Sequence, residues 1–115
     1  MLTINEVIDR LDEFNGKQVE IGGILNFEFE NASLEHYPKA EHRDASDDRA
    51  QPYYPSSIWL AFGSGSIQPN MKALMRWNGK RVRVTGIMAA AEAPFGCGHF
   101  SAWGCEIMPY TIERI

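Results

Sequence analysis

The sequence lacks long apolar stretches and has little cysteine. None of its 115 residues lies in an apolar run near the roughly 18 residues that a membrane-spanning helix needs, so we expect no membrane span. The N-terminal segment MLTINEVIDRLDEF has neither the basic start nor the apolar block of a secretory signal, which favours a cytoplasmic protein. In that compartment Cys97 and Cys105 are expected to be free thiols.

Familiar catalytic signatures are also absent from the sequence. There is no Walker loop, dinucleotide fingerprint, nucleophile elbow or HExxH motif, and the GSGS segment at 63–66 lacks the Lys that a phosphate loop requires. Cys97 and His99 would make a nucleophile–base pair, but no third group orients them. The sequence therefore predicts no enzymatic function and no cofactor.

Three residues of metal-ligand type lie close together in the sequence, namely Cys97, His99 and Cys105, and His36 or His42 would supply a fourth. Structural zinc sites use paired C-x₂₋₄-C knuckles, and Cys97-Gly98-His99 is too tight to form one. Buried thiols and a histidine bonded to backbone are the favoured interpretation, with a zinc site as the alternative.

Charge is distributed unevenly along the chain, whose net charge is −4. The first 57 residues contain five Lys and Arg against twelve Asp and Glu, whereas the last 58 contain six against three. An acidic protein repels phosphate at long range, although a local basic strip still binds a few phosphates.

Hydrophobic periodicity predicts two helices and five strands within a single domain, 1–115. A helix is expected over 1–14, with Thr3 and Glu6 as a capping box. Strands are expected over 19–30, 33–37, 58–62, 81–90 and 106–113, the last with Met108, Tyr110 and Ile112 on one face. A second helix is expected over 70–77, with Met71, Leu74, Met75 and Trp77 as its apolar stripe. Residues 38–57 are polar and rich in proline, which predicts a long exposed loop.

One sequence motif occurs twice, as FNGKQVEIGGIL at 14–25 and as WNGKRVRVTGIM at 77–88. Six of the twelve positions are identical, including Asn15/Asn78, Gly16/Gly79 and Gly23/Gly86. Each copy is expected to end a helix, turn, and begin a strand whose glycine permits sharp coiling.

This order of elements resembles the five-stranded OB-fold, which carries a helix between its third and fourth strands. The pattern G-K-x-V-x-[IV]-x-G is similar to the first and fourth strands of small bacterial anticodon-binding-like OB proteins. The resemblance covers about residues 15–115 and implies a mainly β, Greek-key barrel. It implies binding rather than any particular ligand, since OB barrels bind single-stranded nucleic acid, oligosaccharides or proteins.

Aromatic and basic residues are candidates for contact with single-stranded nucleic acid. OB-type ligands usually lie on the second and third strands, where bases stack on aromatic rings. Trp59 is the best candidate because it opposes the apolar face of its strand. The full set of expected ligand contacts is Tyr37, Trp59, Phe95, Phe100 and Trp103, with the basic strip Lys80, Arg81 and Arg83. The alternative interpretation is that the aromatics are packing residues and the strip is a solvated surface.

Acidic residues surround the junction of the first two strands, which suits a basic protein partner. They include Glu28, Glu30, Glu35, Asp47 and Asp48. Small acidic proteins that neutralise basic toxins have this character, while simple solubility explains the same charges. The leading hypothesis is therefore a non-enzymatic module that binds a basic protein, immunity-like in one version, with single-stranded nucleic-acid binding as the alternative.

Overall fold

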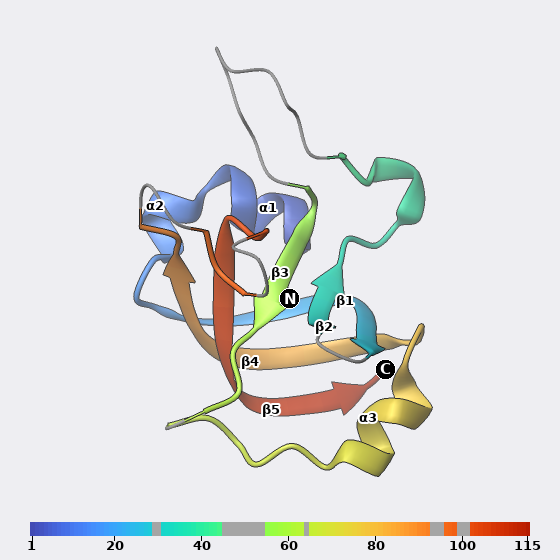
Figure 1. Cartoon of the computed structure of the whole chain (residues 1–115). Coiled ribbons are helices and arrows are strands. Elements are labelled where there is room, and N and C mark those ends of the chain that lie inside the picture. Colours follow the sequence, from blue (N-terminus) through green and yellow to red (C-terminus); the bar gives the residue numbers. More distant parts are fainter. Residues whose placement is uncertain (29–30, 45–54, 64, 93–95, 99–101) are drawn as a thin grey trace.

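Five strands close into a barrel in the order β1–β2–β3–β5–β4, as the computed structural model shows (Figure 1). The model describes residues 1–28, 31–44, 55–63, 65–92, 96–98 and 102–115. The strands are β1 (Gln18–Glu28), β2 (Asn31–Glu35), β3 (Ser57–Leu60), β4 (Arg81–Ala90) and β5 (Cys105–Arg114). Neighbouring strands are antiparallel except for β3 and β5, which are parallel. The predicted mainly β, OB-like barrel is confirmed, with a helix before β1 and another between β3 and β4.

β1 is long enough to pair with both of its neighbours, and its alternating sequence places Val19, Ile21 and Leu25 in the core. Ile24 pairs with Glu35 of β2 and with Arg81 of β4, so the strand must bend where it passes between them. A Cβ on Gly23 would lie 2.9 Å from the Glu35 carbonyl oxygen. Glycine is therefore required here by the close approach of the β2 backbone.

β4 has the same feature at Gly86, where a Cβ would lie 2.2 Å from the Met108 carbonyl oxygen. The β4–β5 register shifts between Thr85 and Gly86, and this irregularity changes which β5 side chains face inward. Cys105, Ile107 and Pro109 are buried, whereas Tyr110 is 38% exposed. The predicted shared face of Met108, Tyr110 and Ile112 is therefore wrong. Tyr110 is an extra residue in β5, between the partners of Thr85 and Gly86, and this bulge places Met108 and Ile112 on opposite faces of the strand.

The N-terminal segment forms two short helices, α1 (Ile4–Asp9) and α2 (Leu11–Phe14), rather than one continuous helix. The Thr3 hydroxyl accepts from the Glu6 backbone N–H at 3.2 Å, which confirms the predicted N-cap. The Glu6 carboxylate accepts from the Thr3 hydroxyl instead of the Thr3 backbone N–H, so the capping box is incomplete. Ile4 and Val7 bury the inner face of α1 against the barrel.

Helix α3 (Met71–Trp77) begins at its N-cap Asn70, whose side chain accepts from the Ala73 N–H. Its buried residues are Ala73 and Leu74, whereas Met71 is 53% and Met75 66% exposed. The predicted apolar stripe is wrong for these two methionines because only one narrow side of the helix faces the barrel. A short 3₁₀ turn, η1 (Lys39–Glu41), lies in the expected 38–57 loop, of which residues 45–54 fall outside the described residues.

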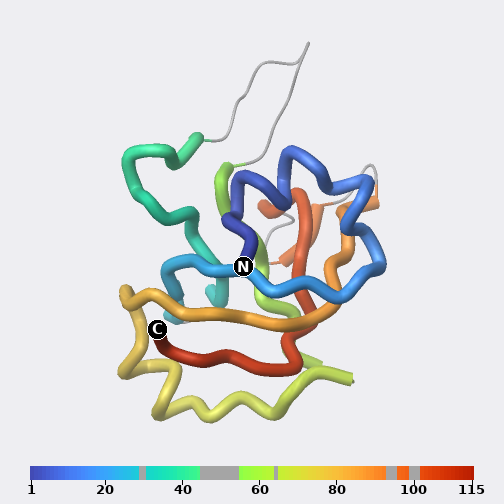
Figure 2. The backbone as a smooth tube through the Cα atoms, turned by 180° about the vertical axis from the view of Figure 1, so that it is seen from behind, coloured from blue at the N-terminus to red at the C-terminus, as the bar shows by residue number. Residues whose placement is uncertain are grey.

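The two copies of the repeat make reciprocal contacts. Gly16 N–H donates to the Met88 carbonyl at 2.7 Å, and the equivalent Gly79 N–H donates to the Leu25 carbonyl at 2.7 Å. The Asn15 side chain accepts from Ala90 N–H, and the equivalent Asn78 side chain accepts from Phe27 N–H, both at 2.9 Å. Each turn therefore binds the far end of the other copy's strand, so β1 and β4 are related by a pseudo-two-fold axis. Figure 2 shows these two strands running side by side, β1 in light blue and β4 in orange.

The barrel interior and the underside of α1 form one apolar core. Ile21, Leu34, Ile58, Val84 and Ile107 are all fully buried in it. None of the helices in the described part of the chain is long and apolar enough to cross a bilayer.

Candidate functional site

A groove of about 560 Å³ lies on the outer face of β1 and β2, and we name it the Glu35 groove. It is bounded by the second half of β1, the end of β2, the η1 segment and the turn that follows α3 (Figure 1). Its lining comprises Ile24, Leu25, Asn26, Glu28, Glu35, His36, Lys39, His42, Asn78 and Gly79. Charged, amide and imidazole side chains from segments far apart in sequence are thus brought to one place.

The Glu35 carboxylate is held in a fixed position by its neighbours. Its Oε1 atom accepts from the Ser57 hydroxyl at 2.9 Å and lies 3.1 Å from the Ser33 hydroxyl. Both serines are buried, with exposures of 3% and 0%. The Glu35 Oε2 atom lies 3.4 Å from His42 Nε2, and the Glu35 side chain remains 30% exposed. A preorganised and partly exposed carboxylate of this kind can receive a hydrogen-bond donor from solution at little ordering cost.

Alternation along the strands places this carboxylate on the outside of the barrel. Leu34 points into the core, so Ser33 and Glu35 point outward, and Ser57 lies opposite Glu35 in the β2–β3 pairing. The Trp103 indole N–H donates to the Ser57 hydroxyl at 2.7 Å. A hydrogen-bonded chain therefore runs from Trp103 through Ser57 to Glu35.

Other charges adjust the electrostatics of the groove. Glu28 is exposed at the end of β1. Glu41 and Asp44 are also exposed, and in the sequence they lie within two residues of His42, which lines the groove. Lys39 adds one positive charge to the lining, so the groove and its rim are acidic on balance. His42 Nδ1 lies 3.6 Å from an Asp44 carboxylate oxygen.

The wall of the groove is anchored to α1. Asn5 donates from its side chain to the Glu41 carbonyl at 2.9 Å, and it accepts from the Ser56 hydroxyl at 2.6 Å. Ser56 in turn accepts from the Arg43 N–H at 2.9 Å, and the Arg43 guanidinium pairs with Asp9 at 2.9 Å. The segment carrying Lys39 and His42 is thereby tied to the N-terminal helix and to the entrance of β3.

His36 is buried in the same wall, with 2% of its surface exposed. Its Nδ1 atom accepts from the Asn5 backbone N–H at 3.2 Å, which places the proton of the neutral imidazole on Nε2. Within the described part of the chain, Nε2 is a buried side-chain atom with no hydrogen-bond partner. Burial lowers the pKa of His36, so the neutral form predominates.

The two predicted tryptophans lie against each other. The rings of Trp59 and Trp103 have centroids 4.8 Å apart and are tilted by 52°. Gly98 approaches the Trp59 ring so closely that a Cβ there would lie 2.5 Å from it. Trp59 is therefore half-buried rather than freely exposed, although one part of it lines a second cavity described below.

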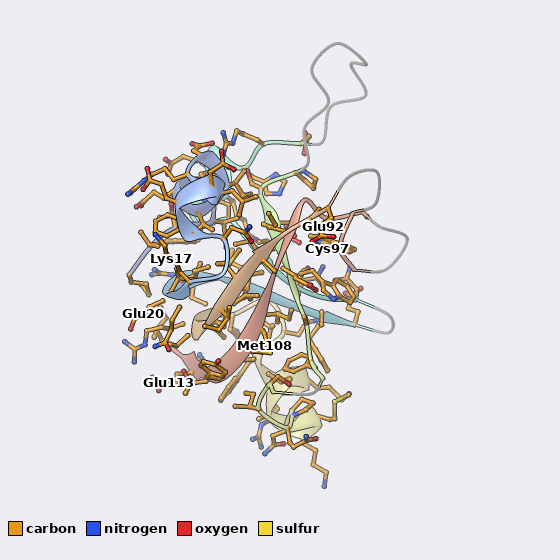
Figure 3. The ribbon with its side chains drawn as sticks, turned by 90° about the vertical axis from the view of Figure 1, so that its left-hand side faces the viewer. Lys17, Glu20, Glu92, Cys97, Met108 and Glu113 are labelled. Carbon is orange, nitrogen blue, oxygen red and sulfur yellow. The ribbon has the colours of Figure 1, made fainter. Side chains whose placement is uncertain are left out.

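The basic strip is divided between different contacts. Arg83 pairs with Glu113 of β5, while the Arg81 guanidinium lies 4.0 Å from the centroid of the Tyr37 ring. Tyr37 is 40% exposed, and Lys80 is exposed in the turn before β4. Figure 3 shows Glu113 and Glu20 on one side of the barrel and Cys97 with Glu92 on the opposite side. Within the basic strip, Arg81 is the residue whose strand partner, Ile24, lines the Glu35 groove.

Cys97 and Cys105 are both free thiols. Cys105 is 1% exposed, and burial raises its pKa to about 12, so it is protonated and unreactive at neutral pH. Burial also raises the pKa of Cys97. Within the ranges that the structure describes, no three His, Cys, Asp or Glu side chains gather closely enough to hold a metal ion.

Several predicted site residues lie outside the described residues. These are Glu30, Asp47, Asp48, Phe95, His99 and Phe100. Of the predicted residues that are described, the structure brings Glu28 and Glu35 together in one groove. It also brings Trp59 into contact with Trp103, and Tyr37 into contact with Arg81.

Sequence reasoning named His36 only as a candidate fourth zinc ligand. It missed Asn78 in the groove lining and the residues that support the groove, namely Asn5, Ser33 and Ser57. The serines alternate with buried apolar residues in β2 and β3, and that pattern was the available signal for an outward position. Their joint contact with Glu35 depends on the β2–β3 register, which the sequence does not show.

The comparisons with known proteins find no match: no protein-family model, no curated protein and no solved structure is significantly similar to this chain. The functional argument therefore depends on the groove itself.

Proposed function

We propose that this chain is a non-enzymatic binding module whose Glu35 groove receives a basic side chain of a protein partner. The observation that carries the proposal is the Glu35 carboxylate, fixed by two buried serine hydroxyls yet open to a groove that also contains Glu28. A charge-assisted hydrogen bond to such a carboxylate is stronger than a neutral one. An Arg or Lys side chain is the protein group that complements two carboxylates.

The position of the groove on the barrel supports the same function. OB-type barrels commonly bind ligands on the face of their second and third strands. Glu35 of β2 and Ser57 of β3 lie on the outer surface of that face. Neutralisation of a basic toxin is one form of this function, in which the acidic rim would also speed the encounter.

The test is capture of a partner by two matched variants. Immobilised protein is incubated with lysate of the native organism, and retained proteins are identified by mass spectrometry. Wild type is expected to retain a basic protein in stoichiometric amount, while Glu28→Gln/Glu35→Gln is expected to lose it by about tenfold or more, because truncating close charge pairs costs at least 1.4 kcal/mol or so. Gln keeps the size of the side chain and an oxygen that accepts from the serines.

Asp12→Asn is the control, because Asp12 is an exposed carboxylate on α2, outside the groove lining. It removes one negative charge and should retain the partner. Failure of wild type to retain any stoichiometric protein, or equal retention by the double variant, would contradict the proposal.

A second candidate function is binding of single-stranded nucleic acid, favoured by the contact between Arg81 and Tyr37. The exposed ring offers a stacking surface, and Arg81 and Lys80 supply positive charge beside the groove. Anisotropy of a labelled oligothymidine at low salt tests it: affinity should weaken steeply with added salt and fall in Tyr37→Ala. Absence of binding at low salt would remove this candidate.

A further inference from the structure

A second cavity of about 300 Å³ adjoins the Glu35 groove, and we name it the Trp59 pocket. Its lining is mainly apolar and comprises Phe27, Ala32, Trp59, Leu60, Phe62 and Met71, together with Glu28 and Asn31. Glu28 also lines the Glu35 groove, so the two depressions meet at its carboxylate. An acidic site and an apolar site are therefore neighbours on one surface.

The Trp59 pocket has a rigid floor and an accessible rim. Leu60 and Ala32 are 1% and 9% exposed, and the half-buried Trp59 is supported by Trp103 and Gly98. Met71 stands 53% exposed at the first turn of α3. Apolar pockets beside polar groups are typical of sites that anchor one side chain of a partner.

We propose that the Trp59 pocket anchors an apolar side chain of the same partner segment whose basic side chain enters the Glu35 groove. This inference rests on the proposed function and adds the sequence that the partner must present. The acidic groove favours a basic side chain by charge complementarity. Because Glu28 lines both depressions, the apolar pocket belongs to the same surface as the groove. The recognised element is an extended segment with one Arg or Lys and one large apolar residue.

The strand register sets the spacing between these two residues. Glu28 pairs with Asn31 and Ile24 pairs with Glu35, so the row of Asn26 and Ser33 lies midway between the two carboxylates. Along β2, Ser33 is two residues, or about 7 Å, from Asn31, which lines the Trp59 pocket. Side chains at i and i+2 of an extended peptide are also about 7 Å apart and lie on one face. We therefore expect the basic and apolar residues to be separated by one residue.

Blocked pentapeptides test this spacing without knowledge of the natural partner. The probes are Ala-Arg-Ala-Phe-Ala and its reverse-order form Ala-Phe-Ala-Arg-Ala, compared with Ala-Arg-Ala-Ala-Ala, Ala-Arg-Phe-Ala-Ala and Ala-Glu-Ala-Phe-Ala. Titration to millimolar concentration is followed by NMR at the Trp59 indole N–H and the Met71 methyl group. One of the two spaced Arg–Phe peptides should bind at least about tenfold tighter than each of the other three, since burying a Phe side chain is worth about 1.5–3 kcal/mol.

Protein variants assign the gain to the pocket. Met71→Ala should reduce the advantage of the spaced Arg–Phe peptide over Ala-Arg-Ala-Ala-Ala. Met75→Ala is the matched control, because Met75 is an exposed methionine on the same helix and does not line the pocket. Glu28→Gln should weaken every arginine peptide that binds.

The outcomes separate the two proposals. Equal affinity for the spaced Arg–Phe peptides and for Ala-Arg-Ala-Ala-Ala would overturn the apolar anchor and leave the basic site standing. Equal affinity for Ala-Glu-Ala-Phe-Ala would overturn the requirement for a basic residue, and with it the proposed function. If no peptide binds at millimolar concentration, both proposals fail.

Discussion

At the scale of single residues, His36 stands out because its burial has a consequence for stability. It packs beneath α1 with Nδ1 bonded to Asn5. The charged groups that influence it are Glu6 of α1 and Glu41, His42 and Arg43 of the adjoining segment. Burial lowers its pKa more than the nearby carboxylates raise it, so the folded protein takes up a proton less readily than the unfolded chain.

A lowered pKa in the folded state means that stability falls as pH drops below the ordinary histidine value of about 6.5. Between about pH 7.5 and about pH 5.5, wild type should lose more free energy of unfolding than His36→Asn, in which the amide oxygen can still accept from the Asn5 N–H. Urea denaturation at both pH values measures the difference. A His36→Asn variant that retains the wild-type pH dependence would contradict the assignment.

Some glycines of the repeated motif, like His36, are explained by residues that are distant in the sequence. Gly16 and Gly79 need a positive φ, with values of 78° and 79°, but a Cβ at either would meet nothing within 4 Å. Gly23 and Gly86 are required instead by the backbone of a neighbouring strand. The repeated motif thus contains two glycines for two different reasons, one local and one tertiary.

At the scale of elements, the reciprocal turns connect the two halves of the barrel. Asn15 and Asn78 each accept from a backbone N–H near the far end of the other copy's strand. Asn78 also lines the Glu35 groove, whereas Asn15 does not. The same structural role is therefore combined with a position in the proposed binding groove in only one copy.

Replacement of these asparagines should separate the two roles. Asn15→Ala and Asn78→Ala should each lower the free energy of unfolding by about 1 kcal/mol, because each removes one hydrogen bond to a strand. The double variant should show roughly the sum of both effects, measured by chemical denaturation. Only Asn78→Ala should alter binding of the arginine peptides. Unequal stability costs would show that the two turns are not structurally equivalent, and equal effects on peptide binding would contradict the separate role of Asn78.

At the scale of the whole molecule, barrel closure decides where the charges lie. The acidic first half and the more basic second half of the chain do not form opposite poles, since β1 and β4 are neighbours and Glu20 lies near Arg83. Arg83 is paired by Glu113 from the last strand. Among the described residues, by contrast, neither Glu28 nor Glu35 forms a salt bridge with a Lys or Arg.

The sequence predicted only part of the candidate site, because the fold brings together groove residues that are far apart in the chain. Glu28 and Glu35 belong to an acidic region that is visible in the sequence, and Trp59 to an alternating strand. The serines that fix Glu35 come from two strands, and the walls of the groove come from β1, the η1 segment and the turn after α3. A site assembled from segments this far apart depends on register and loop placement, which leave no local pattern.

The sequence by itself determined the number and order of strands, the helix positions, the N-cap at Thr3 and the two glycine-ended turns, because each follows from alternation or from backbone freedom over a few neighbouring residues. Tertiary structure alone decided the β5 register, the exposure of Met71 and Met75, and the groove around Glu35. The bulge at Tyr110, opposite Thr85 and Gly86, changes the inward face of β5, and simple alternation along that strand does not predict it. Local steric preferences depend on residues that are adjacent in the sequence. Contacts between distant residues depend on how the strands pair in the closed barrel.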